Sequence, residues 1–186
     1  MKKFAVVTND LQFAAANKHP ERKKAVSKFL PKQTVFLKRM RSLHVPIIHL
    51  QLVVSEEDPR SKGIKDEEKF TLGSKGVRVL AEVLEEGDVV IQKPKDSGFF
   101  ETTLDKTLKA KGVTDIIITG MQTQICVQTT AADGYFRGYT IWVPSDGVVS
   151  TREEDTKRAL EWLQGYCATV KSLDEISEHV KENNEK

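Results

Sequence analysis

Residues 116–127 read IIITGMQTQICV and contain the clearest structural pattern of the chain. It opens with a run of isoleucines without polar–apolar alternation, which is typical of a strand in a parallel sheet covered on both faces. Gly120 then marks a tight turn, and a helical pattern follows over residues 123–136. The stretch therefore predicts a buried strand, a turn and a helix, with Cys126 in the first turn of that helix.

Similar units occur on both sides of this stretch. Short runs rich in Val and Ile predict strands at residues 4–8, 45–54, 89–92, 116–119 and 140–143. Helical spacing, with capping boxes at residues 151–154 and 172–175, predicts helices at 32–43, 103–111, 123–136, 152–166 and 173–181. This alternation predicts a doubly wound α/β fold, a three-layer α/β/α sandwich around a mostly parallel sheet, with residues 1–186 as a single domain.

Charge and hydropathy exclude several classes of protein. The chain has 29 Lys and Arg against 27 Asp and Glu, so the basic clusters at 21–24 and 38–41 are interpreted as solvated helix faces and not as a nucleic-acid surface. No apolar run approaches the ~18 residues of a membrane span. The apolar stretch at 4–7 is too short for a signal peptide, and two cysteines are typical of a reducing compartment. We therefore expect a cytoplasmic protein without nucleic-acid or membrane partners.

Residues 55–76, SEEDPRSKGIKDEEKFTLGSKG, are highly charged and show little periodicity. One interpretation is a solvated surface loop. The other is a lid, or an excursion that contacts substrate above the sheet, because long loops in compact domains often have a function.

Three polar residues directly follow predicted strands: Asp10, Lys93 and, after the turn, Cys126. Each also has an ordinary explanation, as a turn or cap residue, a solvated lysine or an inert buried thiol. Cys167 fits the inert explanation better than Cys126 does. The first turn of a helix favours a thiolate and offers N–H donors to an oxyanion.

Together these residues suggest a nucleophile, an acid/base group and a cation at one edge of the sheet. In this hypothesis the Cys126 thiolate attacks a carbonyl, Asp10 relays the proton to the leaving group, and Lys93 keeps Asp10 ionised or orients the substrate. A response-regulator-like receiver is disfavoured, because residues 53–55 (VVS) supply no acceptor aspartate.

Several motifs surround these positions: Lys93 followed by SGF at 97–99, the block at 116–131, DLQF at 10–13, and TIWVPSDG at 140–147 followed by Ser150. They resemble the motifs of the isochorismatase-like cysteine hydrolases, most closely at 120–131, and the resemblance spans roughly residues 4–180. The resemblance implies a Rossmann-like parallel sheet between helices, which agrees with the strand and helix pattern.

The resemblance also implies that Asp10, Lys93 and Cys126 form a catalytic triad. It further implies a cis peptide bond between Met121 and Gln122, which would direct the N–H groups of Gln122 and Cys126 at an oxyanion.

Phe13, Phe99 and Gln122 are candidate substrate-binding residues from their positions beside these motifs. Family members are commonly dimers or larger, so we expect a homodimer or a larger homo-oligomer that acts on a small molecule.

Departures from the family pattern narrow the expected chemistry. Nicotinamidases of this superfamily carry a metal site rich in Asp and His after the second strand, but here that stretch has only His49, interpreted as structural. We therefore expect no metal and no other cofactor. Isochorismate-cleaving members typically lack the cysteine, whereas this chain keeps Cys126. The sequence thus favours an amidohydrolase that cleaves a C–N bond through a thioester, an EC 3.5.1-like activity.

One alternative from another class remains open. The family's usual opening motif, DMQNDF, is reduced here to DLQF at 10–13. A regulatory or scaffold protein that keeps the fold but has lost turnover would fit this erosion.

Overall fold

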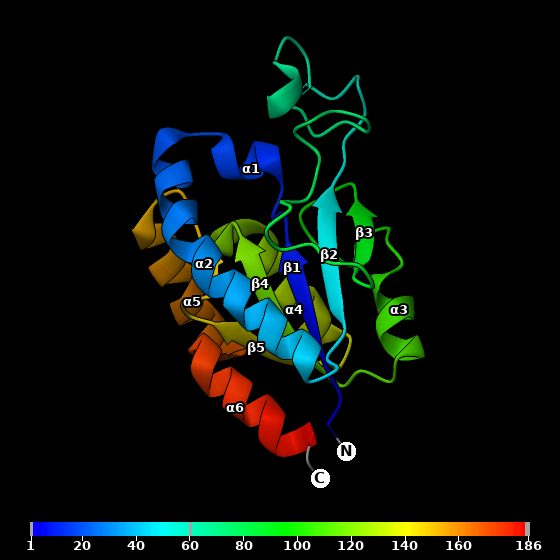
Figure 1. The fold of residues 1–186 in the computed structure, drawn as a ribbon, viewed down its shortest axis with the longest axis vertical. Helices are drawn as coiled ribbons and strands as arrows, with labels where there is room; N and C mark the ends of the chain where they lie inside the picture. The colour runs from blue at the N-terminus through cyan, green and yellow to red at the C-terminus, as the bar shows by residue number, and fades with distance from the viewer. Residues whose placement is uncertain (1, 60, 185–186) are drawn as a thin grey trace.

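A computed structural model describes residues 2–59 and 61–184 of the chain (Figure 1). One sheet has the strand order β3-β2-β1-β4-β5-β7, with β6 paired to β4, and each pairing is parallel. The strands are β1 (Phe4–Asn9), β2 (Ile47–Leu52), β3 (Val89–Lys93), β4 (Asp115–Met121), β5 (Thr140–Pro144), β6 (Val148–Val149) and β7 (Thr169–Lys171). The chain runs outward from β1 to β3 and returns to β4 on the other side of β1. The carboxyl ends of β1 and β4 are thus the topological switch point, where doubly wound sheets bind ligands.

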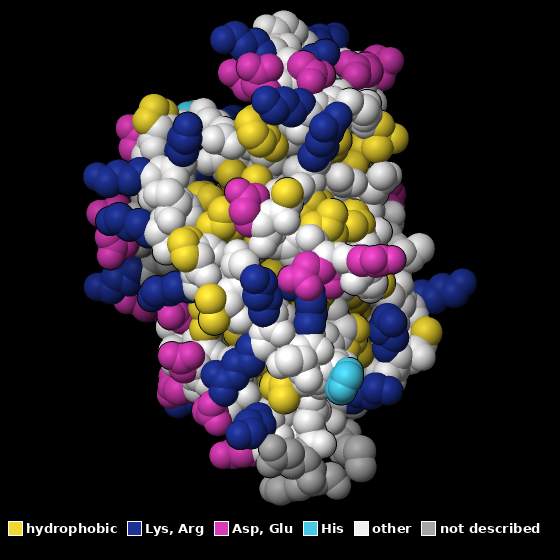
Figure 2. All heavy atoms as spheres, viewed as in Figure 1, with side chains coloured by type: hydrophobic (Ala, Val, Ile, Leu, Met, Phe, Trp, Pro, Cys, Tyr) yellow, Lys and Arg dark blue, Asp and Glu magenta, His cyan; other side chains and the backbone are white. Residues whose placement is uncertain are grey.

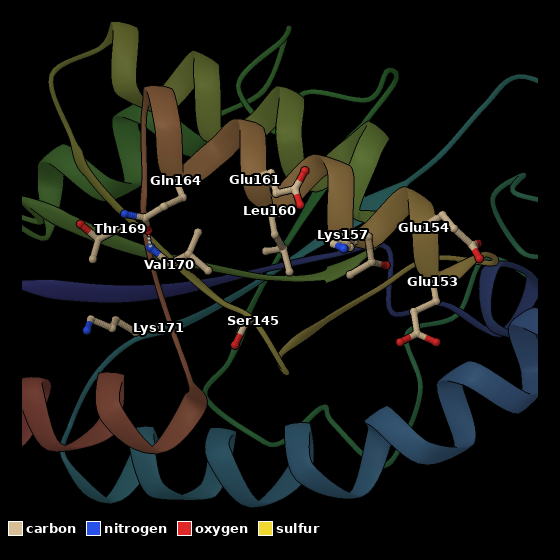
Figure 3. A pocket seen from close by; sticks show the side chains of 11 residues that line it. Ser145, Glu153, Glu154, Lys157, Leu160, Glu161, Gln164, Thr169, Val170 and Lys171 are labelled. Carbon is tan, nitrogen blue, oxygen red and sulfur yellow. Dashed lines mark hydrogen bonds between the residues drawn. The ribbon is translucent and has the colours of Figure 1, made fainter.

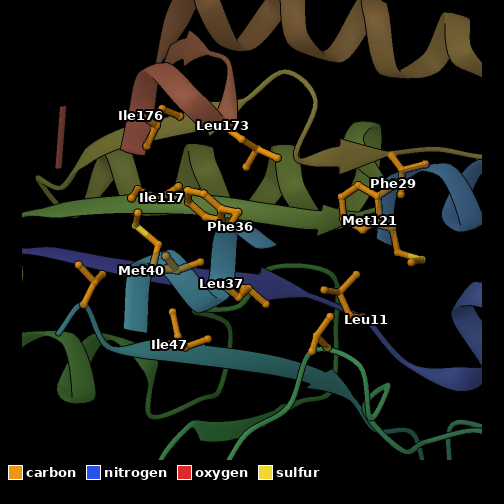
Figure 4. Packing of buried hydrophobic residues seen from close by; sticks show 14 of the residues in the cluster. Leu11, Phe29, Phe36, Leu37, Met40, Ile47, Ile117, Met121, Leu173 and Ile176 are labelled. Atoms are coloured by element: carbon orange, nitrogen blue, oxygen red, sulfur yellow. The ribbon is translucent and has the colours of Figure 1, made fainter. Parts of the chain in front are cut away.

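Helices cover both faces of this sheet (Figure 1). On one face lie α2 (Pro20–Ser42) and α6 (Leu173–Asn184), and on the other lie α3 (Leu104–Ala110), α4 (Gln128–Phe136) and α5 (Glu153–Tyr166). The short helix α1 (Phe13–Asn17) precedes α2. Figure 4 shows the first of these layers, in which residues of α2 and α6 pack on the sheet: Phe36, Leu37, Met40, Leu173 and Ile176 against Ile47 and Ile117.

The central strands are buried on both sides, which explains their unbroken apolar runs. All six residues of β1 are buried. Phe4 and Val6 belong to the cluster under α2 and α6, whereas Ala5 and Val7 belong to the cluster under α3, α4 and α5. Side chains alternate between the faces of a strand, and a fully buried Val contributes about 1.5–3 kcal/mol. Both helix layers are therefore held by the same few strands.

The sequence correctly predicts the fold class and the five main strands. The strands β6 and β7 are too short, at two and three residues, to show a pattern. Helix α2 begins at Pro20, well before the predicted start at residue 32. Its first half exposes many charged side chains, and Pro31 lies inside the helix where proline usually signals an end.

One of the two predicted capping boxes is present. At the start of α6, Ser172 N donates to Glu175 Oε2 at 2.8 Å, and Glu175 N donates to Ser172 Oγ at 3.2 Å. The box predicted at 151–154 is wrong. The N-cap of α5 is Arg152 and makes no side-chain cap hydrogen bond. The Thr151 hydroxyl bonds to Gln122 instead, at 3.0 Å.

Residues 53–88 connect β2 to β3 and extend beyond the carboxyl end of the sheet, as the cyan-to-green segment of Figure 1 shows. Residue 60 lies outside the described residues. This connection contains the 3₁₀ turn η1 (Asp66–Glu68). Gln12 joins the end of β2 to a later part of this connection, because Nε2 donates to Leu52 O at 3.0 Å and to Val77 O at 2.8 Å. The connection is thereby fixed beside the end of β1.

The surface carries charges of both signs. Figure 2 shows Lys and Arg side chains interspersed with Asp and Glu on the face drawn there, in keeping with a formal net charge of +2. Within residues 2–59 and 61–184, no helix combines the length and the apolar character that crossing a bilayer needs.

Candidate active site

A buried ion pair joins the ends of β1 and β3. Asp10 follows β1 with a left-handed backbone, φ 50°, and its Oδ2 accepts a hydrogen bond from Lys93 Nζ at 3.1 Å. Lys93 is the last residue of β3 and is fully buried. Its Nζ also donates to the carbonyl oxygens of Lys95 and Asp96, both at 3.0 Å. Three oxygens therefore hold this ammonium inside the protein.

Cys126 lies beside this pair, in the π-helical turn η2 (Thr123–Val127) that leads from β4 into α4. Its thiol is buried, 3.7 Å from Asp96 Oδ1, and interacts with the Asp10 carboxyl. The Met121–Gln122 peptide bond is cis. Gly120 lets β4 approach β1 closely here, since it has φ +102° and a Cβ at this position would lie 2.3 Å from Asn9 O.

Burial and neighbouring charge set the protonation of the three groups. Burial raises the pKa of the Cys126 thiol, and the Asp10 carboxylate raises it further, against the opposing effect of Lys93. Burial also raises the pKa of Asp10, despite the Lys93 ammonium. At Lys93 burial acts against the charge, but Asp10 and Cys126 outweigh it and raise the pKa.

The resting thiol is therefore protonated at neutral pH. This corrects the expectation that the first turn of the helix favours a thiolate. The physical reason is that burial and the adjacent carboxylate outweigh the helix terminus.

A cavity of about 560 Å³ opens above Asp10 and Cys126. Four of its lining residues, Pro59, Ile64, Glu68 and Phe70, come from the segment 55–76. The structure therefore agrees with the interpretation of this segment as an excursion that faces the site. The rest of the lining is Asp10, Ala15, Lys18, His19, Arg22, Leu52, Asp96, Met121, Gln122, Ile125 and Cys126.

A chain of hydrogen bonds connects the cavity wall to the start of α5. Gln122 Oε1 accepts from Thr151 Oγ1 at 3.0 Å and from Thr151 N at 3.3 Å. Thr151 Oγ1 in turn accepts from Arg22 Nε at 2.8 Å. Thr151 thus connects two cavity residues that are distant in sequence, Arg22 and Gln122.

The structure does not bring Phe13 and Phe99 to this cavity, unlike Gln122. Phe13 begins α1 and lines a separate cavity, where Lys75 Nζ lies 4.7 Å from its ring centroid. Phe99 is buried in the core and stacks on Tyr139, with ring centroids 6.0 Å apart. The prediction that Phe13 and Phe99 line the substrate cavity is therefore wrong. A position beside a motif in the sequence does not fix the direction of a side chain.

Arg22 and Asp96 line the cavity, although the sequence does not predict them as site residues. The sequence pattern predicts a solvated basic cluster around Arg22, but Arg22 is only 8% exposed, while Glu21, Lys23 and Lys24 are exposed. A signal was present: Arg22, Val26, Phe29 and Gln33 share one helical face and are all buried. Asp96 lies within the motif that begins at Lys93.

His49 has a structural role. Its Nδ1 lies 2.8 Å from Thr8 Oγ1 and its Nε2 lies 3.1 Å from Asp88 Oδ2, while Arg41 also binds Asp88. Burial lowers the pKa of His49. In the described part of the chain, His, Cys, Asp and Glu side chains do not gather in groups of three that could hold a metal ion.

A larger cavity, about 840 Å³, lies between α5 and β7 (Figure 3). Its wall holds charged residues such as Glu153, Lys157 and Lys171, and Gln164 Oε1 accepts a hydrogen bond from Val170 N at 2.7 Å. None of the sequence-predicted site residues lines it.

The comparisons with known proteins agree with this architecture. A family model described as "Isochorismatase domain" matches residues 4–175. A solved isochorismatase-like hydrolase from Alkaliphilus metalliredigens superposes with a TM-score of 0.84 at 23% identity, covering 95% of this chain and 98% of that one. An N-carbamoylsarcosine amidase from Thermoplasma acidophilum gives a TM-score of 0.77 at 28% identity, covering 92% and 97%.

Two curated relatives match about half of the chain. The ureidoacrylate amidohydrolase RutB of Methylobacterium radiotolerans is 44% identical over 94 residues, which cover 48% of this chain and 36% of that protein. RutB of Yersinia enterocolitica is 51% identical over 91 residues, covering 47% and 40%. The matched stretch is thus well under half of each curated relative.

A parallel sheet between two helix layers defines an α/β fold, and a thiol, a carboxylate and an ammonium lie together at the carboxyl ends of its strands. With the family model matching residues 4–175, the chain belongs to the Isochorismatase family.

Proposed function

We propose that this protein hydrolyses an amide-type C–N bond of a small molecule, with Asp10, Lys93 and Cys126 as its catalytic triad. One observation carries the proposal. The Cys126 thiol and the Asp10 carboxyl share one cavity, and Asp10 is held by Lys93 at 3.1 Å. A nucleophile with an adjacent, oriented base is the arrangement that covalent catalysis needs.

The names of the relatives support the choice of bond. Ureidoacrylate amidohydrolase and N-carbamoylsarcosine amidase each describe hydrolysis at a ureido or carbamoyl group. The proposed substrates are therefore small amides, ureido compounds or carbamoyl compounds.

The first half of the reaction forms a thioester. Asp10 removes the proton from Cys126 Sγ as the sulfur attacks the carbonyl carbon, and the backbone N–H groups of Gln122 and Cys126 stabilise the oxyanion. Asp10 then gives the proton to the leaving nitrogen. The C–N bond breaks, and ammonia or an amine departs.

The second half restores the enzyme. Asp10, again a carboxylate beside Lys93, takes a proton from water as the oxygen attacks the thioester carbon. The C–S bond breaks, and the thiol regains its proton from Asp10. Each step uses only groups of this chain and water.

The test measures ammonia release from a panel of small amides, ureido acids and carbamoyl compounds. We expect turnover by the native protein, no turnover by Cys126→Ala, and normal turnover by Cys167→Ala, which removes the other buried thiol. Intact-protein mass spectrometry during turnover is expected to show the acyl adduct on Cys126.

Full activity in Cys126→Ala would refute the nucleophile. No turnover of any panel member, together with no acyl adduct on Cys126, favours the alternative that the protein is a regulatory or scaffold member of the family.

We also propose that the protein is a homodimer or a larger homo-oligomer, as the family resemblance implies, and that it lies in the cytoplasm, as its composition suggests. Light scattering on the purified protein tests the assembly, and a mass equal to one chain contradicts it.

A further inference from the structure

We propose that Arg22 binds a negatively charged group of the substrate, so that the preferred substrates are carbamoyl or amide compounds carrying a carboxylate. This inference rests on the proposed function and deepens it by assigning the substrate's charge.

Arg22 lies in the first turn of α2 and turns inward. It lines the same cavity as Asp10 and Cys126 and is 8% exposed. Burial lowers the pKa of Arg22, and Arg22 and Cys126 both face this cavity. The guanidinium is therefore within the reach of a molecule bound at Cys126.

The partners of Arg22 are all neutral. Nε donates to Thr151 Oγ1 at 2.8 Å, and Nη1 donates to Ala15 O at 3.2 Å. Within residues 2–59 and 61–184, no carboxylate forms an ion pair with this guanidinium and no group accepts from Nη2. A guanidinium has five N–H donors, and a carboxylate can bind two of them at once.

A buried cation without a counter-ion is costly. Lys93, the other buried cation of this site, shows the contrast, because it is paired with Asp10. An anion entering the cavity would supply the partner that Arg22 lacks.

The remaining charges of the cavity suit such a substrate. Lys18 lies four residues before Arg22 and adds a second positive charge to the cavity wall. Asp96 lies next to the thiol, and its Oδ1 accepts a hydrogen bond from Cys126 Sγ at 3.7 Å. The carboxylate of a substrate is thus directed to Arg22, and the N–H groups at its scissile end are directed to Asp96.

A purely structural role for Arg22 makes a different prediction. Its bond to Thr151 braces Gln122, so loss of that bond alone would reduce activity on every substrate alike. The experiment therefore compares two matched probes, N-carbamoylglycine and N-carbamoylglycinamide, which differ in charge at one end only.

We expect the native enzyme to prefer the acid. In Arg22→Gln, which loses the charge, KM for the acid should rise about tenfold or more relative to KM for the amide, because loss of the bond to Thr151 affects both probes equally. Lys24→Gln, which removes an exposed charge two residues away, should leave both probes unaffected. Circular dichroism melting confirms that each variant folds.

A second measurement does not require turnover. Calorimetric titration of Cys126→Ala with N-carbamoylglycine should show binding that Arg22→Gln weakens in the double variant. The inference is overturned if Arg22→Gln raises KM equally for both probes. It is also overturned if the native enzyme prefers the neutral amide, or if binding of the acid does not depend on Arg22. Such outcomes leave the proposed function intact if ammonia is still released. Absence of ammonia from all probes, with acid binding still dependent on Arg22, refutes the proposed function alone.

Discussion

Lys93 Nζ and Asp10 Oδ2 lie 3.1 Å apart where their side chains are 0% and 6% exposed. Two strand ends thus carry opposite charges in the interior, directly beneath the cavity. The attraction between buried charges offsets their desolvation only while both are present.

Lys93→Met should therefore destabilise the protein strongly, by about 3–5 kcal/mol, because it leaves Asp10 without its cation. Urea unfolding measures the loss. Lys95→Met, at an exposed position two residues on, should change stability by less than about 0.5 kcal/mol. Adding Asp10→Asn to Lys93→Met should recover part of the loss, and a double variant no more stable than the single one would argue against the pair.

The reactivity of Cys126 should follow its raised pKa. Alkylation by iodoacetamide should be slow at pH 7 and accelerate only in the alkaline range, because burial and Asp10 keep the thiol protonated. Asp10→Asn removes the negative charge, so it should lower the pKa of Cys126 and speed alkylation at a given pH while abolishing turnover. Mass spectrometry in a Cys167→Ala background follows the reaction. Rapid labelling of the native thiol at pH 6 would contradict this.

Gly120 should not tolerate a side chain. Gly120→Ala places a Cβ 2.3 Å from Asn9 O at a left-handed φ, and should cost about 2–4 kcal/mol and distort the turn that carries Cys126. Gly165→Ala in α5 is the matched control. Nothing lies within 4 Å of its Cβ position, and alanine is the better helix former, so a gain of about 0.5–1 kcal/mol is expected. Thermal melting compares the two, and equal effects would refute the steric explanation.

Thr151 and Ser172 should differ although both begin a capping-box pattern. Ser172→Ala removes a cap that is present in the structure and should cost about 1 kcal/mol without affecting turnover. Thr151→Val removes the hydroxyl that connects Arg22 to Gln122. We therefore expect kcat/KM to fall while the free energy of unfolding changes little. Denaturation and kcat/KM on the same samples distinguish the roles. A larger loss of stability in Thr151→Val, with activity retained, would assign it to the helix end.

Much of the fold follows from local pattern. Apolar runs such as Ile116–Ile118 predict the buried strands. Because the strands pair in parallel, residues at their carboxyl ends, such as Asp10 and Lys93, lie at one edge of the sheet. The direction of a side chain within a loop or first turn has no such periodicity. Phe99 therefore packs in the core although it ends a motif, and Arg22 points inward from a cluster of exposed charges.

The connection between β2 and β3 lines one part of the cavity, and the ends of the strands line another. The reacting groups are fixed to the sheet, whereas Pro59, Ile64, Glu68 and Phe70 belong to a segment outside it. Under the proposed function, substitutions in this segment should change which small molecule fits above Cys126 and leave Asp10, Lys93 and Cys126 in place. Substrate choice and catalysis could then be altered separately in this fold.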